Sequence, residues 1–263
     1  MGIMNILFHK YHGAGNDFIL INCMKNNIIL SQKQIFFLCN RHLGIGADGL
    51  IRVLPSESHD FKMMYYNADG FEGSMCGNGG RTVAAFAYNE GLSGQKMKFI
   101  AYDGEHEAII LNSDGNSFEV KLSMKDVKIE KIDKSFLLVN TGSPHYVCLV
   151  DNLADFDVVQ NGRKIRYDSK LSADGINVNF MEKKDNQIYI RTYERGVEDE
   201  TLSCGTGVIA SAIASSLWYD GTDFNIITRG GNLQVNFKRA GNIFSEIELT
   251  GPVKSVYNGN INL

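Results

Sequence analysis

A cysteine followed by a glycine-flanked turn occurs twice in this chain, each time ahead of a run of small apolar residues. The first copy is Met75-Cys76-Gly77-Asn78-Gly79-Gly80-Arg81, and the second is Ser203-Cys204-Gly205-Thr206-Gly207. The apolar runs that follow predict two helices, each with its cysteine at the N-terminus. Unpaired backbone N–H groups and the helix dipole stabilise a thiolate at such a position and lower the pKa of the thiol.

Two thiols at matching helix starts favour proton transfer at a single carbon atom. The backbone amides after each cysteine form a cradle for a carboxylate, and they belong to Gly77, Asn78, Gly205 and Thr206. We expect the two helix ends to face each other, so that one thiolate removes the α-proton of a bound amino acid. The opposite thiol then delivers a proton to the other face, which inverts the stereocentre. The same amides stabilise the developing carbanion, so the scheme requires no metal and no organic cofactor.

The composition is that of an ordinary globular protein with a small-molecule substrate. The net charge of the 263 residues is −4, and no basic run points to nucleic acid. No apolar run approaches the ~20 residues that cross a bilayer, and the N-terminus lacks the features of a secretory signal. We therefore expect no membrane partner and a cytoplasmic location. The five cysteines are widely spaced and contain no CxxC, so we expect free thiols.

The order of motifs in the first half of the chain is repeated in the second half at a nearly constant offset. The matched segments, at offsets of 129, 126, 127 and 128 residues, are His12–Ile21 with Thr141–Val150, Ala47–Leu50 with Ala173–Ile176, Tyr66-Asn67 with Tyr193-Glu194, and Cys76-Gly77 with Cys204-Gly205. Each match is weak alone, but four in order predict a duplicated domain.

The predicted fold class is mixed α+β, with two similar lobes related by a pseudo-two-fold axis. The first lobe spans residues 1–125 and the second spans 126–253. The two cysteine helices carry almost no polar face, so each should be buried. We expect each lobe to wrap a curved, mostly antiparallel sheet or barrel around its central helix.

Local patterns give several further expectations. Ser31 begins a helix that we expect to reach Arg41-His42, and Asp103-Gly104 and Asp114-Gly115 predict hairpin turns. The acidic run Glu198-Asp199-Glu200 is expected to lie in solvent or to mark a helix start.

Longer motifs make the chain resemble the diaminopimelate epimerase family. In chain order they are His12–Phe18, Arg41–Gly49, Asn67–Gly70 leading to Met75–Gly79, Asn177–Phe180, Tyr193–Gly196 and Glu200–Gly207. The resemblance covers essentially the whole chain. It implies cofactor-independent interconversion of LL- and meso-diaminopimelate in lysine and peptidoglycan synthesis, a homodimer, and a C-terminal tail, 254–263, that returns to the first lobe.

The same resemblance assigns roles to individual residues. Cys76 and Cys204 would be the acid and base, and the amides of the two cradles would hold the reacting carboxylate. Substrate contacts would fall on Asn16, Asn67, Asn177, Glu194 and Arg195, with His145 and Ser143 supporting the site. An arginine suits the distal carboxylate and a glutamate suits the distal ammonium group.

Two positions depart from the family pattern. Ser143 stands where the family often has asparagine, so a shorter polar contact or water must serve there. Gly49 stands where some members carry glutamine, so that contact is not transferred.

Other interpretations remain open on sequence alone. A related proline or hydroxyproline racemase is the nearest, but such relatives typically have histidine where this chain has Asn78, and they lack a Glu-Arg pair. A cysteine acyltransferase or hydrolase would pair one cysteine with His145, and an inactive binding module would need neither thiol.

Asn67 and Glu194-Arg195 are also common turn residues, and His145 fits a packed core. Cys23, Cys39 and Cys148 are expected in the core. The GxGxxG pattern at Gly44–Gly49 follows a helix, the reverse of a dinucleotide site.

Overall fold

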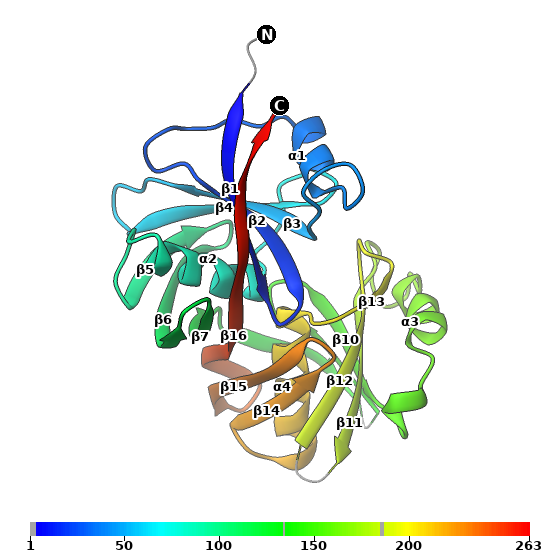
Figure 1. Cartoon of the computed structure of the whole chain (residues 1–263). Helices are drawn as coiled ribbons and strands as arrows, with labels where there is room; N and C mark the ends of the chain where they lie inside the picture. Colours follow the sequence, from blue (N-terminus) through cyan, green and yellow to red (C-terminus); the bar gives the residue numbers. More distant parts are fainter. Residues whose placement is uncertain (1–3, 134, 185–186) are drawn as a thin grey trace. The chain divides into compact units, whose positions relative to one another are not determined.

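A computed structural model describes residues 4–133, 135–184 and 187–263, which fold around two buried helices (Figure 1). The chain divides into two units, and each contains one of these helices. Unit 1 is Met1–Leu122 together with Pro252–Leu263, and unit 2 is Ser123–Gly251. None of the described helices is long and apolar enough to cross a membrane.

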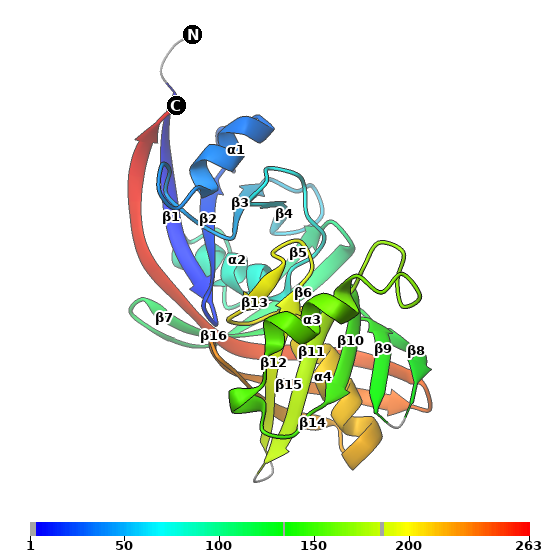
Figure 2. The same cartoon turned by 90° about the vertical axis from the view of Figure 1, so that its right-hand side faces the viewer.

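Unit 1 is a sheet with two helical crossovers. Its elements are β1 (Asn5–Gly13), β2 (Asn16–Asn22), α1 (Gln32–Cys39), β3 (Gly49–Leu54), β4 (Phe61–Asn67), α2 (Gly77–Asn89), β5 (Lys96–Ala101), β6 (Gly104–Asp114) and β7 (Ser117–Met124). The strands pair in sequence order from β1 to β7. Residues Val253–Asn262 of the final strand, β16 (Ile243–Asn262), pair with the other side of β1, as Figures 1 and 2 show.

Two of the pairings in unit 1 are parallel, β2 with β3 and β4 with β5, and the rest are antiparallel. Parallel neighbours need a crossover connection, which is usually a helix. Here α1 connects β2 to β3, and α2 connects β4 to β5. The second crossover places α2 against β1, β2, β3 and β6. Every residue of α2 from Gly77 to Ala87 is buried.

Unit 2 repeats this plan with its own strands. Its elements are β8 (Val127–Ile132), β9 (Phe136–Asn140), β10 (Pro144–Leu149), the 3₁₀ turn η1 (Leu153–Asp155), α3 (Val158–Arg166), β11 (Asn177–Lys184), β12 (Gln187–Glu194), β13 (Asp199–Thr201), α4 (Gly205–Tyr219), β14 (Asp223–Thr228), β15 (Gly231–Ala240) and the first part of β16. The order β8-β9-β10-β11-β12-β14-β15-β16 closes on itself where β16 pairs with β8.

The parallel pairings of unit 2 match those of unit 1. They are β10 with β11, connected through α3, and β12 with β14, connected through α4. The helix α4 packs on six strands of its unit and is buried from Gly205 to Ser216. The predicted mixed α+β class, with two similar and mostly antiparallel sheets around central helices, is therefore confirmed.

Two local expectations were wrong. The helix α1 has the predicted cap, since Ser31 and Gln34 form a capping box, but it ends at Cys39 and not at Arg41-His42. Asn40 stops it, because its side chain accepts hydrogen bonds from the backbone N–H groups of His42 and Leu43, both at 2.9 Å.

The expectation for the acidic run was wrong in part, since Asp199 is exposed as expected but Glu200 is not. Residues Asp199–Thr201 form β13 and not a helix start. The Glu200 side chain is only 8% exposed, because its carboxylate accepts two hydrogen bonds of 2.7 Å from Arg191 and pairs with Arg229 at 3.1 Å.

Candidate active site

Cys76 is the N-cap residue of α2, as the sequence predicts. Its backbone is extended, with φ −112° and ψ 118°, and its Sγ accepts a hydrogen bond from Gly79 N at 3.4 Å. The thiol is partly exposed, whereas the helix behind it is buried. A sulfur that accepts from a free N–H group of the first helical turn is in a position that favours the thiolate.

Asn16 lies beside the first thiol. The Cys76 Sγ lies 3.7 Å from Asn16 Oδ1, and Asn78 Nδ2 donates to the same oxygen at 3.3 Å. The other end of the Asn16 amide donates to Asp48 Oδ2 at 2.7 Å. Unit 1 therefore brings together three of the predicted residues and adds Asp48, which the sequence analysis did not select.

Asp48 belongs to a group of charges at the start of β2 and β3. Arg41 donates to both oxygens of Asp17 at 3.0 and 2.7 Å and to Asp48 at 2.7 Å, and Lys10 pairs with Asp17 at 2.7 Å. Burial opposes the charge on Asp17, but the hydrogen bonds from Arg41 and Lys10 outweigh it and lower the pKa to about 2. Burial and the neighbouring Asp17 charge raise the pKa of Asp48.

Arg81 supports the first cradle from inside the unit. Its guanidinium donates to Asn78 Oδ1 at 2.8 Å and to Gly77 O at 3.4 Å. The side chain is fully buried, and this burial lowers the pKa of Arg81 to about 10, with a smaller opposing effect from Cys76. Arg81 thus holds the backbone turn that presents the amides of Gly77 and Asn78.

Asn67 and Gly49 lie at the same end of the sheet. Gly49 pairs with Phe18 of β2 on one side and with Asn67 of β4 on the other. Asn67 is exposed. A Cβ atom on Gly49 would lie 2.5 Å from Tyr65 Cε2 and 2.6 Å from Tyr66 O, so this chain has no room for a side chain there.

Cys204 is the N-cap residue of α4 and is 7% exposed. Its Sγ lies 3.5 Å from Thr206 Oγ1, which in turn contacts His145 Nε2 at 2.9 Å and Ser143 Oγ at 3.2 Å. Thr141 Oγ1 donates to the Thr206 carbonyl at 2.8 Å, and this hydrogen bond fixes the backbone turn that follows Cys204. The sequence places Ser143 and His145 near the site, and the structure gathers them at the second thiol.

His145 is a fully buried, neutral imidazole. Burial is the main cause that lowers its pKa to about 3, and the nearby Arg195 charge adds to the effect. Both ring nitrogens are occupied, since Nε2 contacts Ser143 and Thr206 and Nδ1 contacts Asn179 Nδ2 at 2.9 Å. This histidine is therefore a poor proton acceptor near neutral pH.

Asn177 connects this cluster to Arg195. Its Oδ1 accepts from Arg195 N at 2.9 Å, and its Nδ2 donates to Ser143 Oγ at 3.1 Å and Pro144 O at 3.0 Å. The Arg195 guanidinium donates to Gly175 O at 3.3 Å, and no carboxylate within the described ranges forms a salt bridge with it. Glu194 is partly exposed at the end of β12. Within the described residues, the Arg195 guanidinium thus has a backbone carbonyl and no carboxylate as its partner.

Asp48, Arg81, Asn179 and Thr192 were missed by the sequence analysis. Two of them carried a usable signal. Asp48 lies in a segment that the internal repeat matches, and Asn179 stands two residues after Asn177 on the same face of β11.

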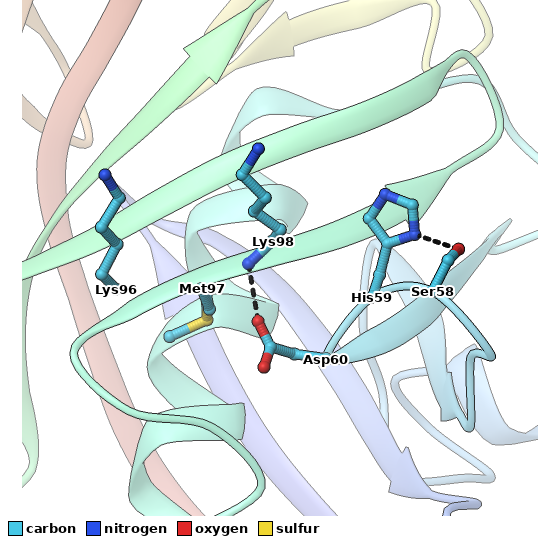
Figure 3. A pocket seen from close by; sticks show the side chains of 6 residues that line it. All are labelled: Ser58, His59, Asp60, Lys96, Met97 and Lys98. Atoms are coloured by element: carbon cyan, nitrogen blue, oxygen red, sulfur yellow. Dashed lines mark hydrogen bonds between the residues drawn. The ribbon is translucent and has the colours of Figure 1, made fainter.

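A separate hollow in unit 1 is lined by none of these residues. Its lining residues are Ser58, His59, Asp60, Lys96, Met97 and Lys98 (Figure 3). Its polar groups are largely paired within the unit: Asp60 accepts from Lys98 N at 2.8 Å, and His59 contacts Ser58 and Glu105. The hollow offers no comparable set of chemical groups.

The chain matches the family model described as diaminopimelate epimerase over residues 8–129 and 137–256. It is 46% identical to a diaminopimelate epimerase of Flavobacterium psychrophilum over 261 residues, which is 96% of this chain and 99% of that one. It is 40% identical over 259 residues to the corresponding protein of Chlorobaculum tepidum, covering 95% and 99% of the two chains. The fold is similar to that of a hydroxyproline epimerase from Agrobacterium vitis, with a TM-score of 0.75, 15% identity, and coverage of 98% of this chain and 93% of that chain.

Proposed function

Because this chain belongs to the diaminopimelate epimerase family, we propose that Cys76 and Cys204 are the acid and base with which it interconverts LL- and meso-diaminopimelate. The observation that carries the assignment is that both cysteines are N-cap residues of the two buried, equivalent helices. One thiolate removes the α-proton, and the other thiol protonates the opposite face of the carbanion. The amides of Gly77, Asn78, Gly205 and Thr206 hold the α-carboxylate and stabilise the added charge.

The distal amino-acid end of the substrate is assigned to charged and polar side chains at strand ends. The guanidinium of Arg195 suits the second carboxylate, and Glu194 suits the second ammonium group. Asn67 and Asn177 lie at strand ends in their respective units and complete the polar contacts. These assignments favour a long diamino dicarboxylate over proline, which has only one carboxylate.

The state of His145 argues against a cysteine hydrolase. Such an enzyme needs a histidine that takes the proton of the nucleophilic thiol. The Thr206 hydroxyl contacts both His145 and Cys204 and so lies between them, and the low pKa of His145 keeps it from accepting a proton near neutral pH.

The decisive experiment is incubation of the enzyme with diaminopimelate in deuterium oxide. We expect deuterium at one α-carbon of the product with inversion, and loss of this exchange in both Cys76→Ala and Cys204→Ala. Full activity in either variant would rule out the two-base mechanism. Turnover of proline but not of diaminopimelate would select the racemase alternative.

We further propose a cytoplasmic homodimer. The described cysteines are all free thiols, which suits a reducing compartment. Exposed apolar side chains lie on two paired strands, with Leu7 on β1 and Val256 and Tyr257 on β16, and they support a contact between copies. Light scattering should give twice the monomer mass, and a monomer at micromolar concentration would contradict the dimer.

A further inference from the structure

We propose that Asn179 is a positioning residue for Cys204, because it fixes the proton of His145 on Nε2 and thereby directs the hydroxyl proton of Thr206 to the Cys204 sulfur. The inference deepens the proposed function. Its expected effect on kcat rests on that function, because it assumes that Cys204 is one of the two acid/base residues. Its structural part depends only on hydrogen bonds inside unit 2. Asn179 and Thr192 are both buried, on β11 and β12, with exposed fractions of 0% and 2%.

The orientation of the Asn179 amide follows from two partners. Thr192 Oγ1 contacts Asn179 Oδ1 at 2.9 Å, and a carbonyl oxygen can only accept, so the hydroxyl is the donor. Asn179 Nδ2 donates to the backbone carbonyl of Tyr146 at 3.3 Å. Both contacts place the NH₂ group of the amide toward β10.

The same NH₂ group determines which nitrogen of His145 carries the proton. Asn179 Nδ2 lies 2.9 Å from His145 Nδ1, and an amide nitrogen can only donate. The Nδ1 atom is therefore an acceptor, and the neutral ring carries its proton on Nε2. Burial, which lowers the pKa of His145 to about 3, keeps the ring neutral.

The proton on Nε2 sets the direction of the remaining hydrogen bonds. Asn177 Nδ2 donates to Ser143 Oγ, and the orientation of this amide is fixed because its Oδ1 accepts from Arg195 N. Among the side chains that Ser143 Oγ contacts, Thr206 Oγ1 at 3.2 Å is then the acceptor for its own proton, since Asn177 Nδ2 and His145 Nε2 are donors. Thr206, which receives protons from Ser143 and His145, has one acceptor left, the Cys204 sulfur at 3.5 Å.

A hydroxyl that donates to sulfur stabilises the thiolate more than the thiol. The groups that contact this cluster from β10, β11 and α4 are uncharged, and the charge whose field reaches the imidazole is that of Arg195. Asn179 also packs against the helix that Cys204 caps, because a Cβ on Gly207 would lie 2.3 Å from Asn179 Oδ1. The chain Thr192–Asn179–His145–Thr206 thus holds a donor on Cys204.

The test is Asn179→Asp, which keeps the side-chain shape and reverses the hydrogen bond to His145. A carboxylate only accepts, so His145 must carry a proton on Nδ1, and, as long as burial keeps the ring neutral, its Nε2 then takes the hydroxyl proton of Thr206 or Ser143. We expect Cys204 to react with iodoacetamide about tenfold more slowly at pH 7, because the loss of the donor raises its thiol pKa and less thiolate is present. Peptide mass spectrometry should show unchanged alkylation of Cys76. We expect kcat to fall at least about tenfold with little change in KM.

Two further measurements keep the inference testable if this variant folds poorly. Thr192→Val removes the hydroxyl that orients Asn179 and should produce a smaller change in the same direction. Nitrogen-15 NMR of the wild-type protein should show His145 protonated on Nε2, and protonation on Nδ1 would overturn the proposal whatever the activity. Asn225→Asp, which adds the same charge at an exposed position of β14, is the matched control and should leave Cys204 reactivity unchanged. Unchanged Cys204 alkylation in a folded Asn179→Asp whose His145 is neutral by the same NMR measurement would also overturn it.

Discussion

The carboxylate of Asp48 accepts a hydrogen bond of 2.7 Å from Asn16 Nδ2, and this contact decides which end of the Asn16 amide faces Cys76. Because the NH₂ group is held by Asp48, the oxygen is the end that remains for the thiol and for Asn78. The first thiol therefore has an amide oxygen among its neighbours, whereas the proposed hydrogen-bond chain gives the second a hydroxyl donor. The two halves of the duplicated fold supply opposite hydrogen-bond partners to their cysteines.

Asp48→Asn should weaken turnover without unfolding the protein. An amide at residue 48 can donate as well as accept, so the Asn16 side chain is no longer held in one orientation. We expect kcat for diaminopimelate to fall about tenfold, which corresponds to about 1.4 kcal/mol. The rate of deuterium incorporation measures it, with Asp114→Asn at the exposed end of β6 as the control. An unaltered rate would show that Asp48 does not position Asn16.

Asp17→Asn should lower the stability of unit 1. The Lys10 side chain is only 8% exposed and pairs with Asp17, so the substitution leaves a buried ammonium group without its carboxylate. We expect the free energy of unfolding to fall by about 3 kcal/mol. Urea denaturation gives this value, and Glu246→Gln, which breaks the exposed pair with Lys238, should cost less than about 1 kcal/mol.

The same ion pair predicts a loss of stability in acid. The pKa of Asp17 is lowered from 3.8 to about 2 in the folded chain. Its stabilising contribution is therefore complete above pH 3.8 and is lost as the pH falls through 2. The stability difference between wild type and Asp17→Asn should shrink over that range, and a constant difference would contradict the pairing.

His145 predicts a second pH dependence, in a higher range. Its folded pKa of about 3 lies below the ordinary value of 6.5, so the unfolded chain binds more protons between these two values. The free energy of unfolding should rise with pH across this range, by up to about 1.4 kcal/mol per unit from this residue. His145→Gln should remove that contribution. Parallel stability curves for the two proteins would mean that His145 titrates normally.

The equivalent glycines of the two helix starts should respond differently to alanine. In Gly207→Ala the new Cβ would meet Asn179 Oδ1 at 2.3 Å, whereas in Gly79→Ala its nearest neighbour would be the flexible Met63 Cε at 3.3 Å. We expect Gly207→Ala to lose at least about tenfold more kcat than Gly79→Ala, measured on the same substrate. Equal losses would show that Asn179 can move without cost.

The cysteine helices were predictable because glycine turns and alanine-rich runs are local signals. The internal repeat also predicted the duplicated fold, since matched motifs at nearly one offset require two similar units. Ser143 was identified as a departure that needed a short polar contact, and its hydroxyl does contact Thr206.

Long-range partners were not predictable from the sequence. Glu200 was interpreted as an exposed acid, but Arg191 on β12 and Arg229 in the turn after β14 pair with its carboxylate, which is 8% exposed. Arg81 follows the first cradle in the sequence, yet only the packed fold shows that its guanidinium turns back to Asn78. The roles of Asp48 and Asn179 depend in the same way on side chains more than 30 residues distant.

The pairing of β16 with β1 has a consequence for how the protein is made. Residues Val253–Asn262 complete the sheet of unit 1, yet the ribosome adds them only after all of unit 2. The N-terminal unit therefore lacks its final strand at a point when the later unit already has all of its own residues. In this protein the order of synthesis and the order of folding need not agree, because Cys76, the first of the two thiols to be synthesised, belongs to the unit whose residues are completed last.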